Sequence, residues 1–490
     1  MFTSDMKQRI GLKPANIVDF VTPDLSRGLL NSIENMGFSP NNLNLKEIKT
    51  HYIINMKKFL LVTFACISFT AFAQQPIPAK PETKSILLAN GTVHIGNGKV
   101  IQNGLVGIKN GKIVLVADAG TSRVENGSYD TTINCMGKQI YPGFIAPDCT
   151  LGLVETESVR AETDVADIGA FNPELRSLIA YNTDSKITPV VRINGVLTAQ
   201  IVPRGGLVSG TSSIVSLDAW NWEDAAIKTD DGVHLDWPRM HRRIRLNEDQ
   251  VGGYADNKNY DKEVQLIQKF FADAHAYMEQ KTHDETDIKM EAMRGIFNGT
   301  ETLFIHAESA KEILASITLV KSYGISKIVL VGGEDSYMIT DFLKQNNISV
   351  IVRRLHSQPD RPEGDVDETY KLPYELQKAG ILYCLGTAGD MEQNATRNLP
   401  FMAGTAAAYG LSKEEALQAI TLNAAKILGI DSHLGSIEEG KDATIIVSSG
   451  DALDMETNNI LWAFIMGRNI QLTSVQTALY KEYMNKYGLK

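Results

Sequence analysis

The stretch IYPGFIAPDCTLGL, Ile140 to Leu153, decides the fold because it predicts a turn, a buried strand and a polar strand end in succession. Pro142-Gly143 is a turn signal, and Phe144-Ile145 begins an apolar run that favours a buried strand. The run ends in three side chains that can coordinate or hydrogen-bond, Asp148, Cys149 and Thr150. This strand end predicts either a functional site or a solvated loop.

Composition places the chain among globular proteins. Its 490 residues are 43% hydrophobic, which allows a large core. The net charge of -10 argues against nucleic acid as a partner. The basic run Arg239 to Arg245 is too short to reverse that conclusion, and it predicts one solvated helix face or loop.

The segment from Met56, MKKFLLVTFACISFTAFAQQ, has the layout of a secretory signal peptide covering residues 56–73. Its apolar run is too short for a membrane span, so no stable span is expected after cleavage behind Ala73. A signal peptide works from the N-terminus. Residues 1–55 are therefore predicted to be a disordered, non-native upstream extension, and the mature protein to be exported to the periplasm.

The remaining pattern divides into four segments. Residues 84–139 show short alternating strands broken by Asn-Gly pairs, which predict hairpin turns at Asn90-Gly91, Asn97-Gly98, Asn103-Gly104 and Asn110-Gly111. Strands and helices alternate over 140–430, as in a parallel βα architecture. The β pattern returns over 431–473, and 474–490 predicts an amphipathic helix. The fold prediction is α/β: a (β/α)8 TIM-like barrel with a small composite β-sandwich formed by both ends of the mature chain.

The opening stretch resembles the first barrel strand of the amidohydrolase superfamily, close to its imidazolonepropionase-like and prolidase-like branch. There a PGFID segment precedes a His-x-His metal pair. In this chain Ala146 stands in place of that Asp, and Asp148 and Thr150 stand in place of the two histidines. The segment Leu434 to Val447 resembles the one that returns the family's chain to its N-terminal strands, with Thr444 where the family has Asp.

The other metal-ligand positions of the family also differ here. His306-Ala307-Glu308 resembles the family's His-Ala-x segment, so His306 is retained at a ligand position. Gly332 occupies the place of a further histidine, and Ala388 that of the Asp that is both ligand and general base. The resemblance implies metal-assisted hydrolysis of non-peptide C–N bonds, often in cyclic amides, or of dipeptides in the prolidase-like branch. In such sites the ion polarises the carbonyl and lowers the pKa of its bound water to about 7.

Two interpretations of this site stay open. In one, a rebuilt site of His306, Asp148 and Asp390, with Glu308 or Glu334, binds one divalent ion, either zinc or a harder ion that oxygen ligands favour. Asp390 is then the catalytic candidate, two residues beyond the lost Asp. In the other, the site no longer holds metal and His306 packs in the barrel. The predicted substrate pocket comprises Thr150, Glu308, Gly332, Ala388 and Arg204, which begins a glycine-rich loop.

Three functions are compatible with the sequence. The first is an active hydrolase with an altered site. The second is an inactive small-molecule-binding protein or partner subunit, as a homo-oligomer or paired with a homologous amidohydrolase. The third is a scaffold. Cys135, Cys149 and Cys384 remain in the mature chain, and a Cys149–Cys384 disulfide or buried free thiols are both compatible with neighbouring first and last barrel strands.

Overall fold

The computed structural model describes residues 78–125, 127–247, 250–280, 282–359 and 364–489. The predicted upstream extension (1–55) and signal peptide (56–73) lie outside these residues. Within them, no helix combines the length and the apolar character needed to cross a membrane.

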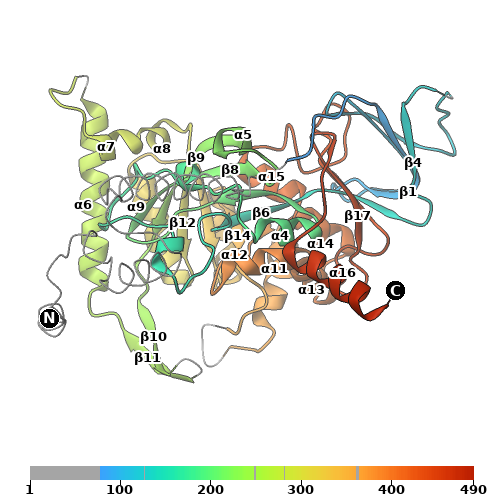
Figure 1. Ribbon diagram of the computed structural model, residues 1–490. Coiled ribbons are helices and arrows are strands. Elements are labelled where there is room, and N and C mark those ends of the chain that lie inside the picture. The colour runs from blue at the N-terminus through green and yellow to red at the C-terminus, as the bar shows by residue number, and fades with distance from the viewer. Residues whose placement is uncertain (1–77, 126, 248–249, 281, 360–363, 490) are drawn as a thin grey trace, which may run out of the picture. The chain divides into compact units, whose positions relative to one another are not determined.

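An eight-stranded sheet forms a nearly closed barrel, since its first and last strands are also in contact. Figure 1 shows strands of this barrel with helices around them. The predicted TIM-like barrel is confirmed in this coarse form. Neighbouring strands, in order, are β6 (Phe144–Cys149), β7 (Val196–Ile201), β8 (Val208–Ser216), β9 (Ala226–Asp236), β12 (Thr302–Ala307), β13 (Ile328–Gly332), β14 (Ser349–Val352) and β15 (Tyr383–Leu385).

One strand departs from the predicted parallel order. β8 runs antiparallel to both β7 and β9, whereas the other ladders of the barrel are parallel. Only six residues separate Ile201 from Val208. A parallel crossover needs about a dozen or more, so this short glycine-rich connection enforces a hairpin.

Helices follow most of the parallel strands. α6 (Tyr260–Glu279), α7 (Ile288–Ala292) and α8 (Arg294–Asn298) precede β12. α9 (Ala310–Ser322), α10 (Thr340–Gln345) and α11 (Glu368–Ala379) follow β12, β13 and β14. α9 begins where Ser309 and Glu312 form a capping box, and it buries Ile313, Ile317 and Val320. α13 (Leu399–Ala408), α14 (Lys413–Ala419) and α15 (Leu422–Leu428) come after β15.

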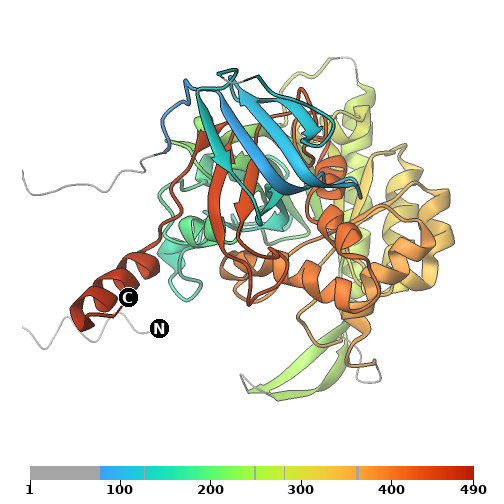
Figure 2. The same ribbon diagram turned by 90° about the vertical axis from the view of Figure 1, so that its right-hand side faces the viewer.

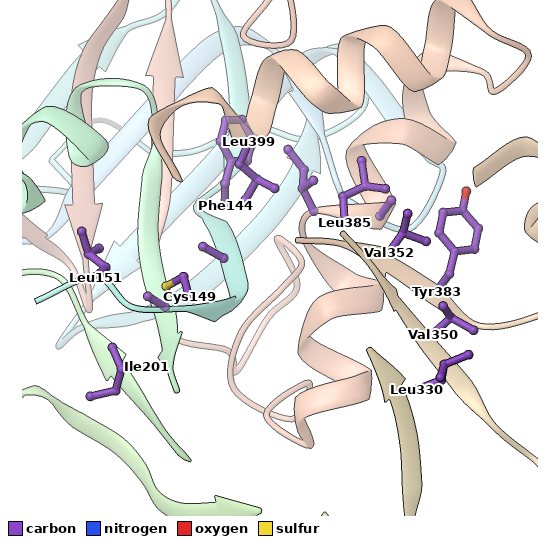
Figure 3. Close-up of a cluster of buried hydrophobic side chains, with 14 of the residues drawn as sticks. Phe144, Cys149, Leu151, Ile201, Leu330, Val350, Val352, Tyr383, Leu385 and Leu399 are labelled. Carbon is purple, nitrogen blue, oxygen red and sulfur yellow. The ribbon is translucent and has the colours of Figure 1, made fainter. Parts of the chain in front are cut away.

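Side chains alternate between the two faces of the barrel wall. Phe144, Cys149, Val350 and Tyr383 belong to the layer that packs against helix residues such as Leu399 of α13 (Figure 3). The alternate positions form a separate cluster that α15 completes, comprising Ile145, Ile351, Cys384 and Leu428 among others. Cys149 and Cys384 therefore lie on opposite faces of the wall and are free thiols, so the disulfide alternative is wrong.

A second sheet joins the two ends of the chain. It contains β1 (Ile86–His94), β2 (Val100–Lys109), β3 (Lys112–Asp118), β4 (Thr131–Asn134), β5 (Gln139–Pro142), β16 (Ile445–Ser448), β17 (Ile460–Ile465) and β18 (Arg468–Asn469). β5 pairs with β1 on one side and β16 on the other. Figure 2 shows these N-terminal and C-terminal strands side by side. α16 (Val475–Tyr487) ends the chain.

The opening stretch thus spans two sheets. Ile140 to Pro142 belongs to the second sheet, and the barrel begins at Phe144 after Gly143. A Cβ atom on Gly143 would lie 2.9 Å from side-chain atoms of Leu197 and Thr444, so this crossing requires glycine.

Two local predictions were wrong. Arg239 to Arg245 does not form a helix, because β10 (His241–Asn247) pairs with β11 (Gln250–Asp256) as a hairpin. Asn90-Gly91 and Asn103-Gly104 lie inside β1 and β2, where Gly91 and Gly104 face each other at an irregularity of the ladder. An added Cβ on Gly104 would lie 2.3 Å from Val93, so the glycines allow close packing there rather than a turn.

Candidate functional site at the carboxyl ends of the barrel strands

The end of β6 places a carboxylate in the barrel centre. Asp148 has a φ of +48°, and the β6–β7 ladder is irregular at this point. Such an irregularity re-aims a side chain, and Asp tolerates the left-handed conformation better than most residues. Asp148 is 0% exposed. Its backbone N–H donates to Gln200 Oε1 at 3.1 Å.

Arg204, from the glycine-rich connection between β7 and β8, holds this carboxylate. Its Nη1 donates to Asp148 Oδ1 at 2.8 Å and its Nη2 to the Asp148 carbonyl at 3.1 Å. Its Nε and Nη2 also donate to the two oxygens of Glu392, each at 3.1 Å. Burial by itself would raise the pKa of Asp148, but the Arg204 guanidinium and further cationic groups lower it below its ordinary value. Asp148 therefore remains ionised.

Two histidines lie beside Asp148. His234, on β9, approaches His306, on β12, with 2.8 Å between its Nδ1 and the His306 Nε2. On its other side His234 Nε2 is 2.8 Å from Ser212 Oγ, which donates to Asp231 Oδ1 at 2.6 Å. His234 was not among the predicted site residues. Its signal in the sequence is a single polar residue between Val233 and Leu235 of the strand.

Arg353, directly after β14, completes the centre. Its Nη2 donates to His306 Nδ1 at 3.1 Å and its Nη1 to Glu308 Oε1 at 2.6 Å. Sequence reasoning missed this residue as well. Arginine is only a donor, so His306 Nδ1 accepts and the proton of a neutral His306 lies on Nε2. His306 then donates to His234 Nδ1, and His234 Nε2–H donates to Ser212.

Burial decides the protonation of these groups. It lowers the pKa of His234 to about 3 and that of His306 well below its ordinary value, so both imidazoles are neutral. Burial also raises the pKa of Asp231 to about 6, at the far end of the hydrogen-bonded chain. The pKa of Asp236, which is 3.9 Å from His306 Nδ1, is raised by the same cause.

Asp148, His234 and His306 are a potential site for a divalent ion. One ligand atom from each lies within 4.8 Å of the others, and Asp148 Oδ2 has no hydrogen-bond partner among the described residues. The groups around the triad, however, do not fit an ion. A histidine that ligates through Nε2 carries its proton on Nδ1 and needs an acceptor there, but His306 Nδ1 faces the donor Arg353. The Arg204 guanidinium already neutralises Asp148.

The predicted metal set differs from the observed group. His234 takes the third place in the triad, whereas Asp390, Glu308 and Glu334 are not part of it. The Glu308 carboxylate is turned to Arg353 instead. Gly332 has a φ of +98°, and a Cβ on it would lie 2.5 Å from Glu308 Oε2. A histidine at this position is therefore incompatible with the Glu308 conformation.

Two adjacent cavities lie above the centre and share Arg353, Ala388, Gly389 and Asp390 in their walls. One has a volume of about 450 Å³ and is lined by Thr150, Arg204, Asp236 and His306 among others. The other, of about 540 Å³, is lined by Glu308, Gly332, Glu334 and Arg354 among others. The five predicted pocket residues each line one or both cavities, and Asp148 lies buried below them.

The fold and the site define a barrel protein with its candidate site at the carboxyl ends of the strands, the usual position in such barrels. The model of the amidohydrolase family matches residues 240–476. An amidohydrolase from Thermotoga maritima is 25% identical, with a TM-score of 0.68 over 78% of this chain and 99% of its own. The chain belongs to the amidohydrolase superfamily.

More distant structures share the fold less closely. A Xaa-Pro dipeptidase with bound methionine is 13% identical, with a TM-score of 0.49 over 79% of this chain and 99% of its own. A molinate hydrolase is 16% identical, with a TM-score of 0.48 over 81% of this chain and 96% of its own. A sequence search of curated proteins found no significant match.

Proposed function

We propose that this protein hydrolyses an amide or related C–N bond of a small molecule held in the cavities above the barrel centre. One observation carries the proposal. The carboxylate of Asp236, the imidazole of His306 and the guanidinium groups of Arg204 and Arg353 converge on one cavity of about 450 Å³ at the carboxyl ends of the strands. Family membership supports the same reaction class.

Asp236 is the candidate general base of this reaction. Its side chain is 35% exposed and lines the cavity, whereas Asp148 is buried and neutralised by Arg204. Asp236 takes a proton from water as the water oxygen bonds to the carbonyl carbon. The C–N bond then breaks, and the nitrogen leaves with that proton to give a carboxylic acid and an amine. The cationic Arg353 favours the negative charge that develops on the carbonyl oxygen.

The test is hydrolysis of a panel of cyclic amides and dipeptides by the full chain, followed by mass spectrometry. Removing a general base typically lowers the rate by about 10²–10⁴-fold, so Asp236→Asn should lose activity on that scale. Asp273→Asn, a surface change on α6, is the matched control. The proposal fails if no compound is hydrolysed faster than in buffer, or if both variants match the wild type.

The finer expectations from sequence are part of this proposal. Cyclic amides are the first substrates to try, and export through residues 56–73 would place the reaction in the periplasm. Edman sequencing of protein recovered from the periplasm would test export, with Gln74 expected as the first residue. We further propose that the sheet shared by the two chain ends is a composite domain that fixes the start of β6.

A non-catalytic role is the second candidate, as a small-molecule-binding protein or as a partner of an active homologue. It is favoured by Asp148, Thr150, Gly332 and Ala388, which stand at ligand positions of the family and leave His306 as the one retained ligand. Thermal stabilisation by a member of the same panel, without turnover, would support this role. Hydrolysis that Asp236→Asn abolishes would exclude it.

A further inference from the structure

We infer that the guanidinium groups of Arg353 and Arg204 stand in for the divalent ion of this barrel centre, so that the site is complete without a metal. The inference concerns the same site as the proposed function. It does not require hydrolysis, because it describes how the centre is held together.

Arg353 follows the strand that lies between two of the family's ligand positions. β14 lies between β13, which ends at Gly332, and β15, which Ala388 follows by three residues. Neither residue has a side chain longer than a methyl group. Arg353, directly after the intervening strand, donates a hydrogen bond to His306 instead. Arg353 thus contacts a retained ligand position from between the two vacated ones.

Glu308 holds Arg353 in this position. It accepts from Arg353 Nη1 at 2.6 Å, and its Oε2 accepts from the Glu334 N–H at 3.3 Å. The same carboxylate fills the space that a Cβ on Gly332 would need, at 2.5 Å. The Glu308–Arg353 pair in this conformation therefore requires glycine at position 332.

Arg204 binds the one carboxylate of the triad, Asp148. Asp148 is the one acidic member of the triad and would supply the negative charge for an ion. Arg204 donates hydrogen bonds to both the side chain and the carbonyl of Asp148. Glu392 accepts two further hydrogen bonds from Arg204. Fork-shaped pairing of this kind is geometrically specific. The carboxylate already has a fixed cationic partner, so an added ion would meet repulsion from it.

The hydrogen bonds of the centre all run in one direction. Arg353, His306, His234 and Ser212 donate in sequence and end at Asp231, with each donor matched to one acceptor. An ion on the two imidazoles would need the His306 proton to move to Nδ1, opposite a guanidinium. The chain of hydrogen bonds is consistent only with the metal-free form.

The experiment measures zinc binding rather than activity. Full-length wild type, Arg353→Met and the control Arg354→Met are dialysed against metal-free buffer, titrated with zinc in a calorimeter and analysed by mass spectrometry for metal content. Arg354 lines the same cavity, but its Nη2 donates to the Asp390 carbonyl and not to His306. We expect less than about 0.1 zinc per chain in wild type and control. We expect at least tenfold tighter binding in Arg353→Met, whose His306 can turn its proton toward Asp236.

Two results would overturn the inference. One is near-stoichiometric zinc in the wild type that His306→Gln removes. The other is a folded Arg353→Met variant that gains no zinc affinity, since the guanidinium would then not be what excludes the ion. Arg353→Gln, which keeps a polar group, replaces Arg353→Met if the latter does not fold. Metal content is read independently of turnover, so failure of the proposed hydrolysis leaves this result interpretable.

Discussion

Replacing Asp148 by Asn removes one negative charge from the barrel centre and keeps the shape of the side chain. Asn tolerates the left-handed backbone at this position, so strain should not contribute. Removing one partner of a buried ion pair typically costs about 3–5 kcal/mol. Arg204 keeps its two hydrogen bonds to Glu392 and is 24% exposed. We therefore expect a loss of about 3 kcal/mol, the lower end of that range.

Urea unfolding at pH 7, followed by tryptophan fluorescence, measures this loss. A double-mutant cycle with Arg204→Met separates the pair from other effects, and we expect a coupling of about 1–3 kcal/mol. Asp273→Asn breaks the Lys269–Asp273 pair on the surface of α6 and should change stability by less than about 1 kcal/mol. A loss at Asp148 no larger than in this control, with additive single changes, would refute the buried-pair argument.

The pH dependence gives a second check. The pKa of Asp148 in the folded protein lies below its ordinary value, so its contribution to stability is present above the pKa of an unfolded carboxyl group. It is lost as the pH falls through the lower folded pKa. The difference in stability between wild type and Asp148→Asn should stay constant from about pH 5 to 8 and close only in strong acid. If the stability difference between the two proteins already shrinks between pH 8 and 6, a group other than Asp148 causes it.

Three further predictions concern other parts of the barrel. Gly332→Ala should lower the free energy of unfolding in urea by about 2–4 kcal/mol, because the new Cβ adds a steric contact with Glu308 to backbone strain. The control is Gly299→Ala, where φ is +79° and the space around the Cβ is open, so that only the strain should appear. Equal losses in the two variants would contradict the contact with Glu308. Burial raises the pKa of Glu301 to about 7, so ionisation of this carboxyl destabilises the fold as the pH rises above 4.5. Glu301→Gln should therefore be more stable than the wild type by up to about 3 kcal/mol at pH 8, and equally stable at pH 4. Burial also raises the pKa of Cys149 and Cys384, so neither thiol should react with a disulfide reagent until the protein is denatured, and a native reaction of either would contradict their placement.

The parallel half of the barrel could be predicted from sequence because its strands are short, continuous apolar runs. The run SVIV, Ser349 to Val352, predicts a strand that coincides with β14. The run KIVLV, Lys327 to Val331, predicts a strand that differs from β13 by one residue at each end. Strands buried on both faces have this signature. Their order in the barrel then follows from the alternation with helices.

β9 and its histidine could not be predicted in the same way. The strand begins AIKTDD, and its inward positions carry Asp231 and His234 rather than apolar residues. A polar inner face breaks the hydrophobic pattern that identifies a strand. The role of Arg353 was also hidden, because it depends on β14 lying between β13 and β15, which the sequence around position 353 does not encode.

The charge at the centre can change without any change in the barrel. A buried carboxylate such as Asp148 needs a compensating cation, whether a metal ion or an arginine. Arg204 and Arg353 supply that charge from positions just beyond β7 and β14, where a new side chain does not alter strand pairing. An exchange of metal ligands for arginines at these positions would therefore leave the fold intact. Membership in the superfamily, which rests on the fold and on residues 240–476, consequently does not decide whether this centre holds an ion.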